Sequence, residues 1–273
     1  MLASIHIYPV KSLGGVEVHE AHVEPWGLRH DRRWLVLKPD GTVLTARKQH
    51  RMLGVKADPA DDGGITLRGL DGSTLHVESP GDGTLAPLSL SRLDSVRLAA
   101  SEASDWLSHQ LQEPVRLGWL DDPRRRTVSV AHGGLPGDRL NLSDAGPLLL
   151  TTQASLRQLN EWIVWTATEG DEEPPAPIMM ARFRPNLVVD GAHKPFAEDN
   201  WRCAQVGDVG FRFAEHCDRC AVTMIDPRTG ATAKEPLRTL ARHRRWGHKT
   251  WFGIRVVPLA TGMIRVGDPV WAA

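Results

Sequence analysis

The first seven residues read Met-Leu-Ala-Ser-Ile-His-Ile, so Ile5 and Ile7 alternate with the polar residues Ser4 and His6. An apolar residue at every second position is typical of a strand with one buried face. The pattern recurs around Val16 and Val18, Leu88 and Leu90, Val96 and Leu98, and at residues 187–189, 209–211, 254–257 and 264–266. Many short strands with few helices favour a barrel or a sandwich over a doubly wound sheet.

Two turn signals join neighbouring strands of this series into hairpins. Pro39-Asp-Gly41 separates residues 34–38 from residues 42–45, and Pro and Gly supply the backbone angles of a tight turn. A second hairpin is expected over residues 65–77, with Asp71-Gly72 at its turn. The first hundred residues are therefore predicted to be β-structure.

Two segments have the periodicity of amphipathic helices. Ser101 is expected to cap the first, in which apolar residues recur at helical spacing until Pro114 ends the run. Residues 152–165 form the second expected helix. Surface loops are predicted at residues 124–137, which begin with three arginines and end in a glycine-rich stretch, and at residues 169–177. The sequence thus predicts a mainly β fold with a few helices, of the α+β class.

The composition limits the function classes. Lys plus Arg and Asp plus Glu each number 33 in the 273 residues, and this balance argues against a generic binder of nucleic acid or anionic membranes. Three cysteines are too few for a disulfide framework, so we expect a reducing compartment. No apolar run approaches the ~20 residues of a membrane helix, and the N-terminal residues lack signal-peptide features. A soluble cytoplasmic protein without a membrane anchor is expected.

The sharpest chemical motif is Cys217-Asp-Arg-Cys220. A zinc site needs four ligands, usually from two such pairs, and no second pair is present. A thioredoxin-like redox pair should open a helix, whereas this one lies between strand-like segments. A single thiolate ligand to a soft metal centre is a third interpretation, since the neighbouring Arg219 would favour the thiolate. An inert buried thiol fits the spacing equally well.

Anion binding is a second possibility raised by the residues themselves. The sequence contains no P-loop, no dinucleotide-binding G-x-G-x-x-G after a strand and no G-x-S-x-G. Lys11 and Ser12 follow the first strand, Arg32 precedes another strand, and Arg47 follows the first hairpin. These side chains form a phosphate or other anion site only if the fold brings them together.

Nine motifs follow one another along the chain in the order of a known family. They are Ile7-Tyr-Pro-Val-Lys-Ser12, Gly27-Leu-Arg-His-Asp-Arg-Arg-Trp34, Thr45-Ala-Arg47, Phe183-Arg-Pro-Asn186, Ala197-Glu-Asp199, Cys217-Asp-Arg-Cys220, Asp226-Pro-Arg-Thr-Gly230, Lys234-Glu-Pro-Leu237 and Val266-Gly-Asp-Pro-Val270. Together they resemble the MOSC superfamily, in the branch of the mitochondrial amidoxime-reducing component and its bacterial relatives. The resemblance runs from Ile5 to Val270.

The resemblance implies a two-domain fold that holds a molybdenum cofactor (Mo-molybdopterin). An N-terminal β-rich MOSC domain would span residues 1–118, although its first strands can complete the second barrel. The MOSC β-barrel would span residues 119–273, and the cofactor would lie in a cleft between the two domains.

The resemblance also implies roles for individual residues. Cys220 would be the catalytic residue, as the protein thiolate on molybdenum. The cofactor-binding residues would be Lys11, Ser12 and Arg32 at the phosphate, with Arg47 as a further cation, Arg184 and Asn186 at the pterin, Asp218 at a position that is usually small and polar, and the segment Asp144, Ala145 and Gly146. Ala145 and Gly146 replace hydroxyl side chains of the family, so only their backbone N–H groups can donate there.

The activity implied by the resemblance is the reduction of N-hydroxylated compounds such as amidoximes, hydroxylamines and N-hydroxylated bases. With three cysteines, the chain cannot ligate an iron–sulfur cluster by four thiolates, so a separate ferredoxin-, flavodoxin- or b-type-cytochrome-like protein would supply electrons. Residues 124–137 are the candidate substrate rim. Two alternatives are a non-catalytic carrier of the cofactor and a sulfur carrier with a persulfide on Cys220 or Cys217.

Overall fold

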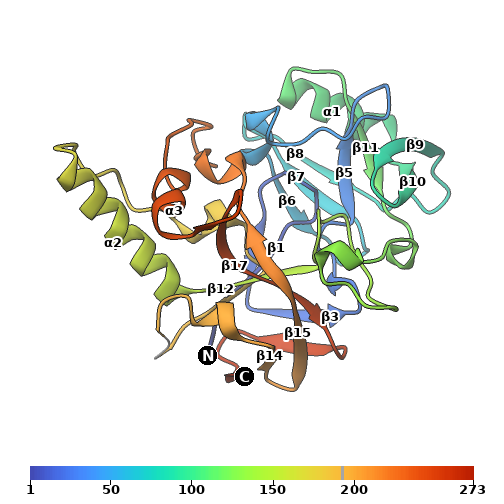
Figure 1. Ribbon diagram of the computed structural model, residues 1–273. Helices are drawn as coiled ribbons and strands as arrows, with labels where there is room; N and C mark the ends of the chain where they lie inside the picture. The colour runs from blue at the N-terminus through green and yellow to red at the C-terminus, as the bar shows by residue number, and fades with distance from the viewer. Residues whose placement is uncertain (192–193) are drawn as a thin grey trace.

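Within residues 1–191 and 194–273, which this computed structural model describes, the largest sheet has nine strands (Figure 1). Its order is β19-β14-β15-β17-β12-β13-β1-β2, and β16 pairs with β17. The strands are β1 (Leu2–Ile7), β2 (Val16–Val18), β12 (Leu148–Thr152), β13 (Leu187–Val189), β14 (Cys203–Val206), β15 (Val209–Asp218), β16 (Arg245–Trp246), β17 (Lys249–Pro258) and β19 (Val270–Ala272). The sheet therefore combines the start of the chain with its C-terminal half.

The alternation in the first seven residues explains how β1 enters this sheet. Strand β1 pairs antiparallel with β13, and Ile5 lies opposite Leu187. Leu2, Ile5 and Ile7 are buried in one core cluster with side chains of β12, β13 and β17. Burial of each such side chain contributes about 1.5–3 kcal/mol. Because β1 is fixed in this way, the residues that follow it lie beside the C-terminal half of the chain.

Three smaller sheets complete the β-structure of the described residues. One has the order β5-β11-β10-β9, the second β6-β7-β8 and the third β18-β3-β4. Their strands are β3 (Glu20–Glu24), β4 (Gly27–Leu28), β5 (Trp34–Leu37), β6 (Lys56–Pro59), β7 (Ile65–Arg68), β8 (Thr74–Val77), β9 (Leu85–Leu90), β10 (Leu93–Leu98), β11 (Arg116–Trp119) and β18 (Gly262–Arg265). The predicted mainly β fold is confirmed.

Of the two predicted hairpins, one forms and the other forms only in part, while a third hairpin that was not predicted joins β9 and β10. Strands β7 and β8 pair across the turn at Asp71-Gly72, and β9 pairs with β10. The segment after Pro39-Asp-Gly41 returns toward β5 but makes only a single bridge, between Leu37 and Val43. Strand β5 pairs instead with β11, which lies far away in the sequence.

Three α-helices pack beside the sheets of the described residues (Figure 1): α1 (Ser101–Leu111), α2 (Gln153–Glu169) and α3 (Leu237–His243). Ser101 is the first helical residue and Ala100 occupies the N-cap without a side-chain bond, so the predicted serine cap is wrong. Thr152 caps α2 by accepting a hydrogen bond from the Ser155 N–H. Helix α3 was not predicted because its seven residues give too short a periodic pattern. None of the helices in these ranges is long and apolar enough to cross a membrane.

Candidate functional site

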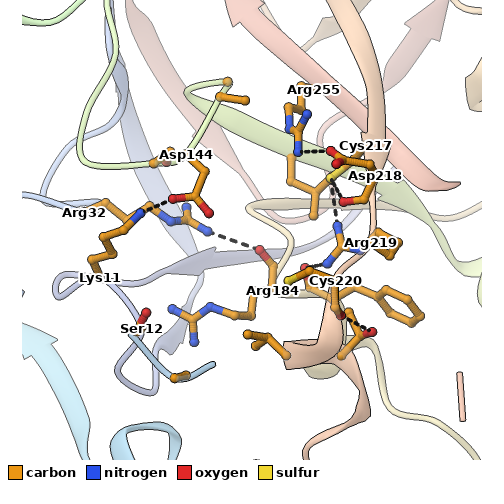
Figure 2. Close-up of a pocket in the computed structure, with 18 of the residues that line it drawn as sticks. Lys11, Ser12, Arg32, Asp144, Arg184, Cys217, Asp218, Arg219, Cys220 and Arg255 are labelled. Carbon is orange, nitrogen blue, oxygen red and sulfur yellow. Dashed lines mark hydrogen bonds and ion pairs between the residues drawn. The ribbon is translucent and has the colours of Figure 1, made fainter. Parts of the chain in front are cut away.

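All eleven site residues proposed from the sequence line a single pocket (Figure 2). They come from segments far apart in the chain: the turn after β1, the turn before β5, the segment between β5 and β6, the segments before β12 and β13, and the end of β15 with the residues that follow it. The residues are Lys11, Ser12, Arg32, Arg47, Asp144, Ala145, Gly146, Arg184, Asn186, Asp218 and Cys220. The cations that the sequence could not connect therefore face the same space as the cysteine motif.

Four cations, Lys11, Arg32, Arg47 and Arg184, form one side of the pocket, which we call the cation wall. Arg32 is anchored beneath the surface, because its Nη1 donates to the fully buried Asp31 (2.6 Å). Its guanidinium also donates to the Asn186 Oδ1 (2.9 Å) and to the Arg184 carbonyl (3.3 Å). Arg32 is thus held in place by three bonds within the protein.

Asp31 and Asn186 are buried residues that orient the wall from behind. The Asp31 carboxylate also accepts from the Tyr8 N–H (2.8 Å) and from the Asn141 Nδ2 (3.1 Å). The Asn186 amide accepts from the Leu149 N–H and donates to the His6 carbonyl, and the residue is fully buried. Asn186 therefore positions Arg32 in this structure.

Tyr8 lies between two arginines of the cation wall. Its ring centroid is 4.2 Å from the Arg184 guanidinium and 4.8 Å from that of Arg32, which is cation–π geometry. Burial raises the pKa of Tyr8 to about 12, so the phenol is neutral at physiological pH. Burial lowers the pKa of Arg184 to about 10, which still leaves it cationic. Aromatic packing thereby keeps two neighbouring cations apart.

Asp144 is the counter-ion of the cation wall. The Lys11 Nζ donates to Asp144 and to the Leu142 carbonyl (2.9 Å), and Arg47 lies 3.7 Å from the same carboxylate. Burial alone would raise the pKa of Asp144, but Lys11, Arg47 and Arg255 outweigh it and lower the value to about 2. Burial also lowers the pKa of Lys11, against the opposing effect of Asp144.

Cys217, Asp218, Arg219 and Cys220 form the facing side, which we call the thiol wall. Cys217 is buried, and its Sγ accepts from the Arg219 Nη1 (2.9 Å). Arg219 also donates to the Phe183 carbonyl (2.7 Å). Cys220 is exposed at the N-cap of a short 3-10 helix, and no group among the described residues hydrogen-bonds to its Sγ. Of the two thiols, Cys220 is therefore the one available to a ligand.

The carboxylate of Asp218 is neutralised on both oxygens. It accepts from the Arg255 Nη2 (2.7 Å) and pairs with the Lys249 Nζ (3.1 Å). Burial alone would raise the pKa of Asp218, but these two cations lower it. Arg255 also pairs with Glu215. The pKa of Arg255 is raised, although burial of the guanidinium would by itself lower it. Asp218 therefore adds no uncompensated negative charge to the pocket.

Three of the eight non-glycine residues with positive φ in the described part of the chain line this pocket. Ser12, Arg32 and Arg184 have φ values of 70°, 48° and 55°, in the left-handed region that non-glycine residues seldom adopt. Such conformations cost of order 1–3 kcal/mol each and persist where the surrounding structure enforces them. Their clustering at one pocket is typical of a functional site.

Arg255, Arg219 and Cys217 line the pocket but were not among the predicted site residues. Arg255 gave one usable signal, since it is a lone cation in the apolar run of residues 254–257. A Cβ on Gly146 would lie 2.8 Å from the Arg255 Cβ, so the glycine makes room for that side chain. The role of Gly146 could not be found from the sequence, because the two residues meet only in the folded chain.

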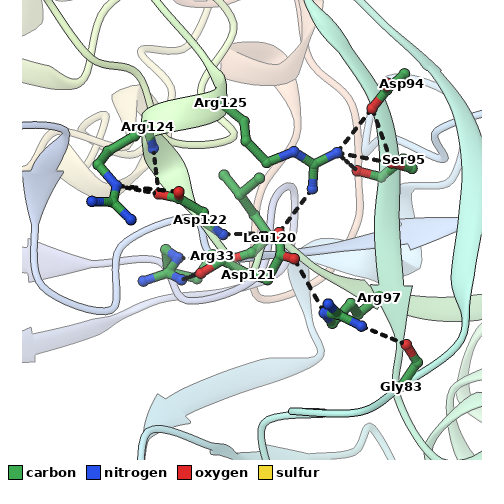
Figure 3. A network of polar contacts seen from close by, with 10 residues as sticks. All are labelled: Arg33, Gly83, Asp94, Ser95, Arg97, Leu120, Asp121, Asp122, Arg124 and Arg125. Atoms are coloured by element: carbon green, nitrogen blue, oxygen red, sulfur yellow. Dashed lines mark hydrogen bonds and ion pairs between the residues drawn. The ribbon is translucent and has the colours of Figure 1, made fainter.

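The segment 124–137, predicted to form the substrate rim, does not line this pocket. Its arginines bond instead to acids and carbonyls near β10 and β11 (Figure 3): Arg124 pairs with Asp122, and Arg125 pairs with Asp121 and Asp94. Arg126 is buried and donates to the carbonyls of Asn141 and Ser143. The segment thus supports the chain before residues 144–146 from behind.

Comparison with known proteins identifies the family. Residues 1–114 match the MOSC N-terminal beta barrel domain, and residues 137–271 match the MOSC domain. The chain belongs to the MOSC family. This MOSC protein is 32% identical to human "Mitochondrial amidoxime-reducing component 1", with 99% of this chain and 82% of that protein covered. The predicted family resemblance is confirmed.

Two further comparisons place this MOSC protein more broadly. It is 31% identical to "Molybdenum cofactor sulfurase" of rice, over 93% of this chain but only 32% of that much longer protein. The solved structure of YiiM from Geobacillus stearothermophilus covers 47% of this chain and 54% of its own, with 13% identity and a TM-score of 0.30. A TM-score of 0.30 is too low to infer a shared fold.

The pocket of this MOSC protein suits an anionic cofactor with a soft metal. The backbone N–H groups of Asp144, Ala145 and Gly146 donate to no group in the described part of the chain, although Ala145 and Gly146 are buried. Buried N–H groups are seldom left unpaired, so those of Ala145 and Gly146 are open donors for a ligand, and the exposed Asp144 adds a third N–H. The Ser143 Oγ and the Arg219 Nε are likewise buried without a partner. These donors, the cation wall and the Cys220 thiol fit a phosphate-bearing cofactor whose metal takes one thiolate.

Proposed function

We propose that this protein binds the molybdenum cofactor in the pocket and reduces N-hydroxylated compounds such as amidoximes. The observation that carries the proposal is the pocket itself, in which an accessible Cys220 thiol faces a wall of anchored cations. The names of the relatives, which refer to amidoxime reduction and to the molybdenum cofactor, support it. No cluster of three or more His, Cys, Asp or Glu suited to a metal occurs in the described ranges.

In this proposal the cation wall holds the cofactor's phosphate. The Lys11 ammonium and the Arg32 guanidinium donate charge-assisted hydrogen bonds, and the Ser12 hydroxyl adds a neutral one. Asp144 competes with the phosphate for Lys11, so it shifts its pairing toward Arg47 when the phosphate binds. The open backbone N–H groups at Ala145 and Gly146 would donate further hydrogen bonds to the cofactor.

The remaining residues hold and orient the cofactor's other parts. Arg184 faces the pterin, while the buried Asn186 acts through Arg32, because its amide already bonds within the protein. Cys220 supplies the thiolate ligand, and Cys217 stays buried against Arg219. When bound, the molybdenum centre supplies the electron-transfer and oxygen-accepting chemistry that side chains lack.

The overall reaction needs electrons from outside. Two electrons and two protons convert an N–OH group to N–H and release water. We propose that a separate redox protein donates these electrons, because three cysteines cannot ligate an iron–sulfur cluster through four thiolates.

The decisive experiment measures benzamidoxime reduction by protein loaded with the molybdenum cofactor and reduced with dithionite. Cys220→Ser is expected to lower benzamidine formation more than 100-fold, since it removes the thiolate ligand. Cys217→Ser is the matched control and is expected to stay within a few-fold of the wild type, because its Sγ contacts only protein groups.

Two outcomes would contradict the proposal. Full molybdenum loading without reduction of any N-hydroxylated compound would favour a cofactor carrier. Equal losses in Cys220→Ser and Cys217→Ser, with a persulfide found on either cysteine of the metal-free protein, would favour a sulfur carrier. Metal content of each variant, measured alongside turnover, separates loss of loading from loss of chemistry.

A further inference from the structure

One segment of the chain concentrates positive charge without acids. Residues 236–267 contain seven Lys or Arg and no Asp or Glu, which leaves 26 basic and 33 acidic residues in the rest of the chain. The protein as a whole is neutral, so this segment sets up a charge asymmetry. It comprises α3, β16, β17 and β18.

One exposed part of this segment is the end of α3 with the β16–β17 hairpin, and we call it the basic hairpin face. It consists of Arg242, Arg245, Trp246, His248 and Lys249, all exposed. Arg242 and Arg245 have no ion-pair partner within the described ranges, in contrast to Arg238 and Arg244 of the same segment, which pair with Glu172 and Asp199. These two cations are therefore open to a partner.

An aromatic pair lies within the basic hairpin face. The Trp246 and Trp251 rings stack with centroids 5.5 Å apart, and the Trp251 Nε1 donates to the Trp246 carbonyl (3.3 Å). Trp246 is 42% exposed, and the Arg244 guanidinium lies 4.8 Å from its ring. A rigid exposed tryptophan among arginines is the composition enriched in protein–protein contact surfaces.

The basic hairpin face adjoins the thiol wall directly. Trp251 lies opposite Asp218 in the β15–β17 register, and the Arg219 N–H donates to the Thr250 carbonyl (2.8 Å). The Lys249 Nζ pairs with Asp218, whose carboxylate lines the pocket. One strand spacing, about 5 Å, thus separates the exposed hairpin from the motif that carries Cys220.

We propose that the basic hairpin face is the docking surface for an electron-carrier protein with an acidic face. The proposal rests on the proposed function, which requires an outside donor of two electrons per turnover. Each encounter would oxidise a one-electron carrier once and pass that electron to the cofactor beside the thiol wall. Positive charge would steer the acidic carrier, and Trp246 would form the apolar centre of the contact.

The test uses the full chain and a reduced plant-type [2Fe–2S] ferredoxin as the acidic probe. Calorimetry at low salt should detect saturable binding that weakens as the Debye length falls from ~30 Å at 0.01 M to ~8 Å at 0.15 M salt. The double variant Arg242→Glu/Arg245→Glu is expected to weaken binding roughly tenfold, because it replaces two attractive contacts with repulsive ones. Its dithionite-driven benzamidoxime reduction should be unchanged, since neither residue lines the pocket.

Arg92→Glu is the matched control. Arg92 is exposed on the β9–β10 turn, away from the hairpin, and has no ion-pair partner among the described residues. It changes the net charge in the same direction, by half as much as the double variant, and should lower ferredoxin affinity less than twofold. Trp246→Ala should weaken binding without changing its dependence on salt, because it removes apolar contact rather than charge.

The outcomes separate this inference from the proposed function. Absence of saturable ferredoxin binding, or equal losses in Arg92→Glu and the double variant, overturns the docking surface while leaving dithionite-driven reduction intact. Tighter binding of single-stranded DNA than of ferredoxin through Arg242 and Arg245 overturns it in favour of a nucleic-acid surface. Failure of dithionite-driven reduction, with ferredoxin binding still lost in the double variant, rejects the function and keeps the surface.

Discussion

The two walls of the pocket are built on opposite principles. In the cation wall, Arg32 and Lys11 are fixed by buried partners before any ligand arrives. In the thiol wall, Cys217 is held by Arg219 whereas Cys220 is exposed and makes no bond through its sulfur to the described residues. The difference shows that the protein prepares its electrostatic field in advance and leaves one ligand atom free.

The largest expected effect concerns the stability of the cation wall. Asp31→Asn should lower the free energy of unfolding by about 3–5 kcal/mol, because Arg32 loses a buried counter-ion and the new NH2 group must face at least one of the three donors that the carboxylate accepts from. For a chain of this size each kcal/mol corresponds to roughly 2–4 °C, so we expect the Tm to fall by about 10 °C. Thermal unfolding followed by circular dichroism measures this.

Asp218→Asn is the matched change in the thiol wall. Asp218 is partly exposed, and Arg255 keeps Glu215 as a partner after the change. Partly exposed ion pairs contribute about 0–1 kcal/mol, so the Tm should fall by less than about 4 °C. Equal falls in Tm in the two variants would mean that both walls depend on their ion pairs to the same degree, and that the cation wall is not the more firmly built of the two.

The second effect concerns anion affinity. Lys11→Met should weaken the binding of inorganic phosphate about 10- to 100-fold, since a charge-assisted hydrogen bond contributes about 1.5–3 kcal/mol. Asp144→Asn should strengthen it several-fold, because it frees Lys11 and Arg47 from their carboxylate. Calorimetry with phosphate measures both, and Arg92→Met controls for net charge. Unchanged affinity in Lys11→Met would place the phosphate elsewhere.

Much of the fold was predictable because it depends on local patterns. The alternation of Ile5 and Ile7 indicates a strand, and Asp71-Gly72 indicates a tight turn, whatever the rest of the chain does. The pairing of β5 with β11 was not predictable, because it joins residues about eighty positions apart and no local signal encodes it. Helix α3 was also missed. Its seven residues are too few for a periodic pattern, and its Leu240 is buried by contacts with segments that are distant in the sequence.

The candidate site divides in the same way. The nine motifs contain the residues of both walls, but they did not mark Cys217 and Arg219 as site residues and did not show how the wall residues contact one another. Asn186 was assigned to the pterin, whereas its buried amide bonds to Arg32, and only the folded chain reveals that geometry. Residues 124–137 were predicted to form the substrate rim. In the folded chain Arg124 and Arg125 are instead neutralised by Asp94, Asp121 and Asp122. Charge pairing between distant segments cannot be read from a run of like charges.

The smallest expected effect is the pH dependence of phosphate binding. It shows whether the cation wall loses positive charge by deprotonation as the pH rises. Burial lowers the pKa of Lys11, so this lysine loses its proton at a lower pH than an ordinary lysine. Arg255, which pairs with Asp218 of the thiol wall, does not follow, because its pKa is raised. Phosphate affinity should therefore fall several-fold between pH 8 and pH 10.5 in the wild type. It should fall less in Lys11→Arg, in which Arg184, with a pKa of about 10, is the wall cation that still titrates in this range.

The stability of the protein should respond with the opposite sign. A lysine whose pKa is lowered by folding binds fewer protons in the folded state than in the unfolded state. Its contribution to the free energy of unfolding therefore rises as the pH increases from below the folded pKa toward the ordinary value of 10.5. Lys11→Arg should lack this rise in Tm. If phosphate affinity declines equally in both proteins, another group titrates, and Lys11 is not the alkaline switch of the cation wall.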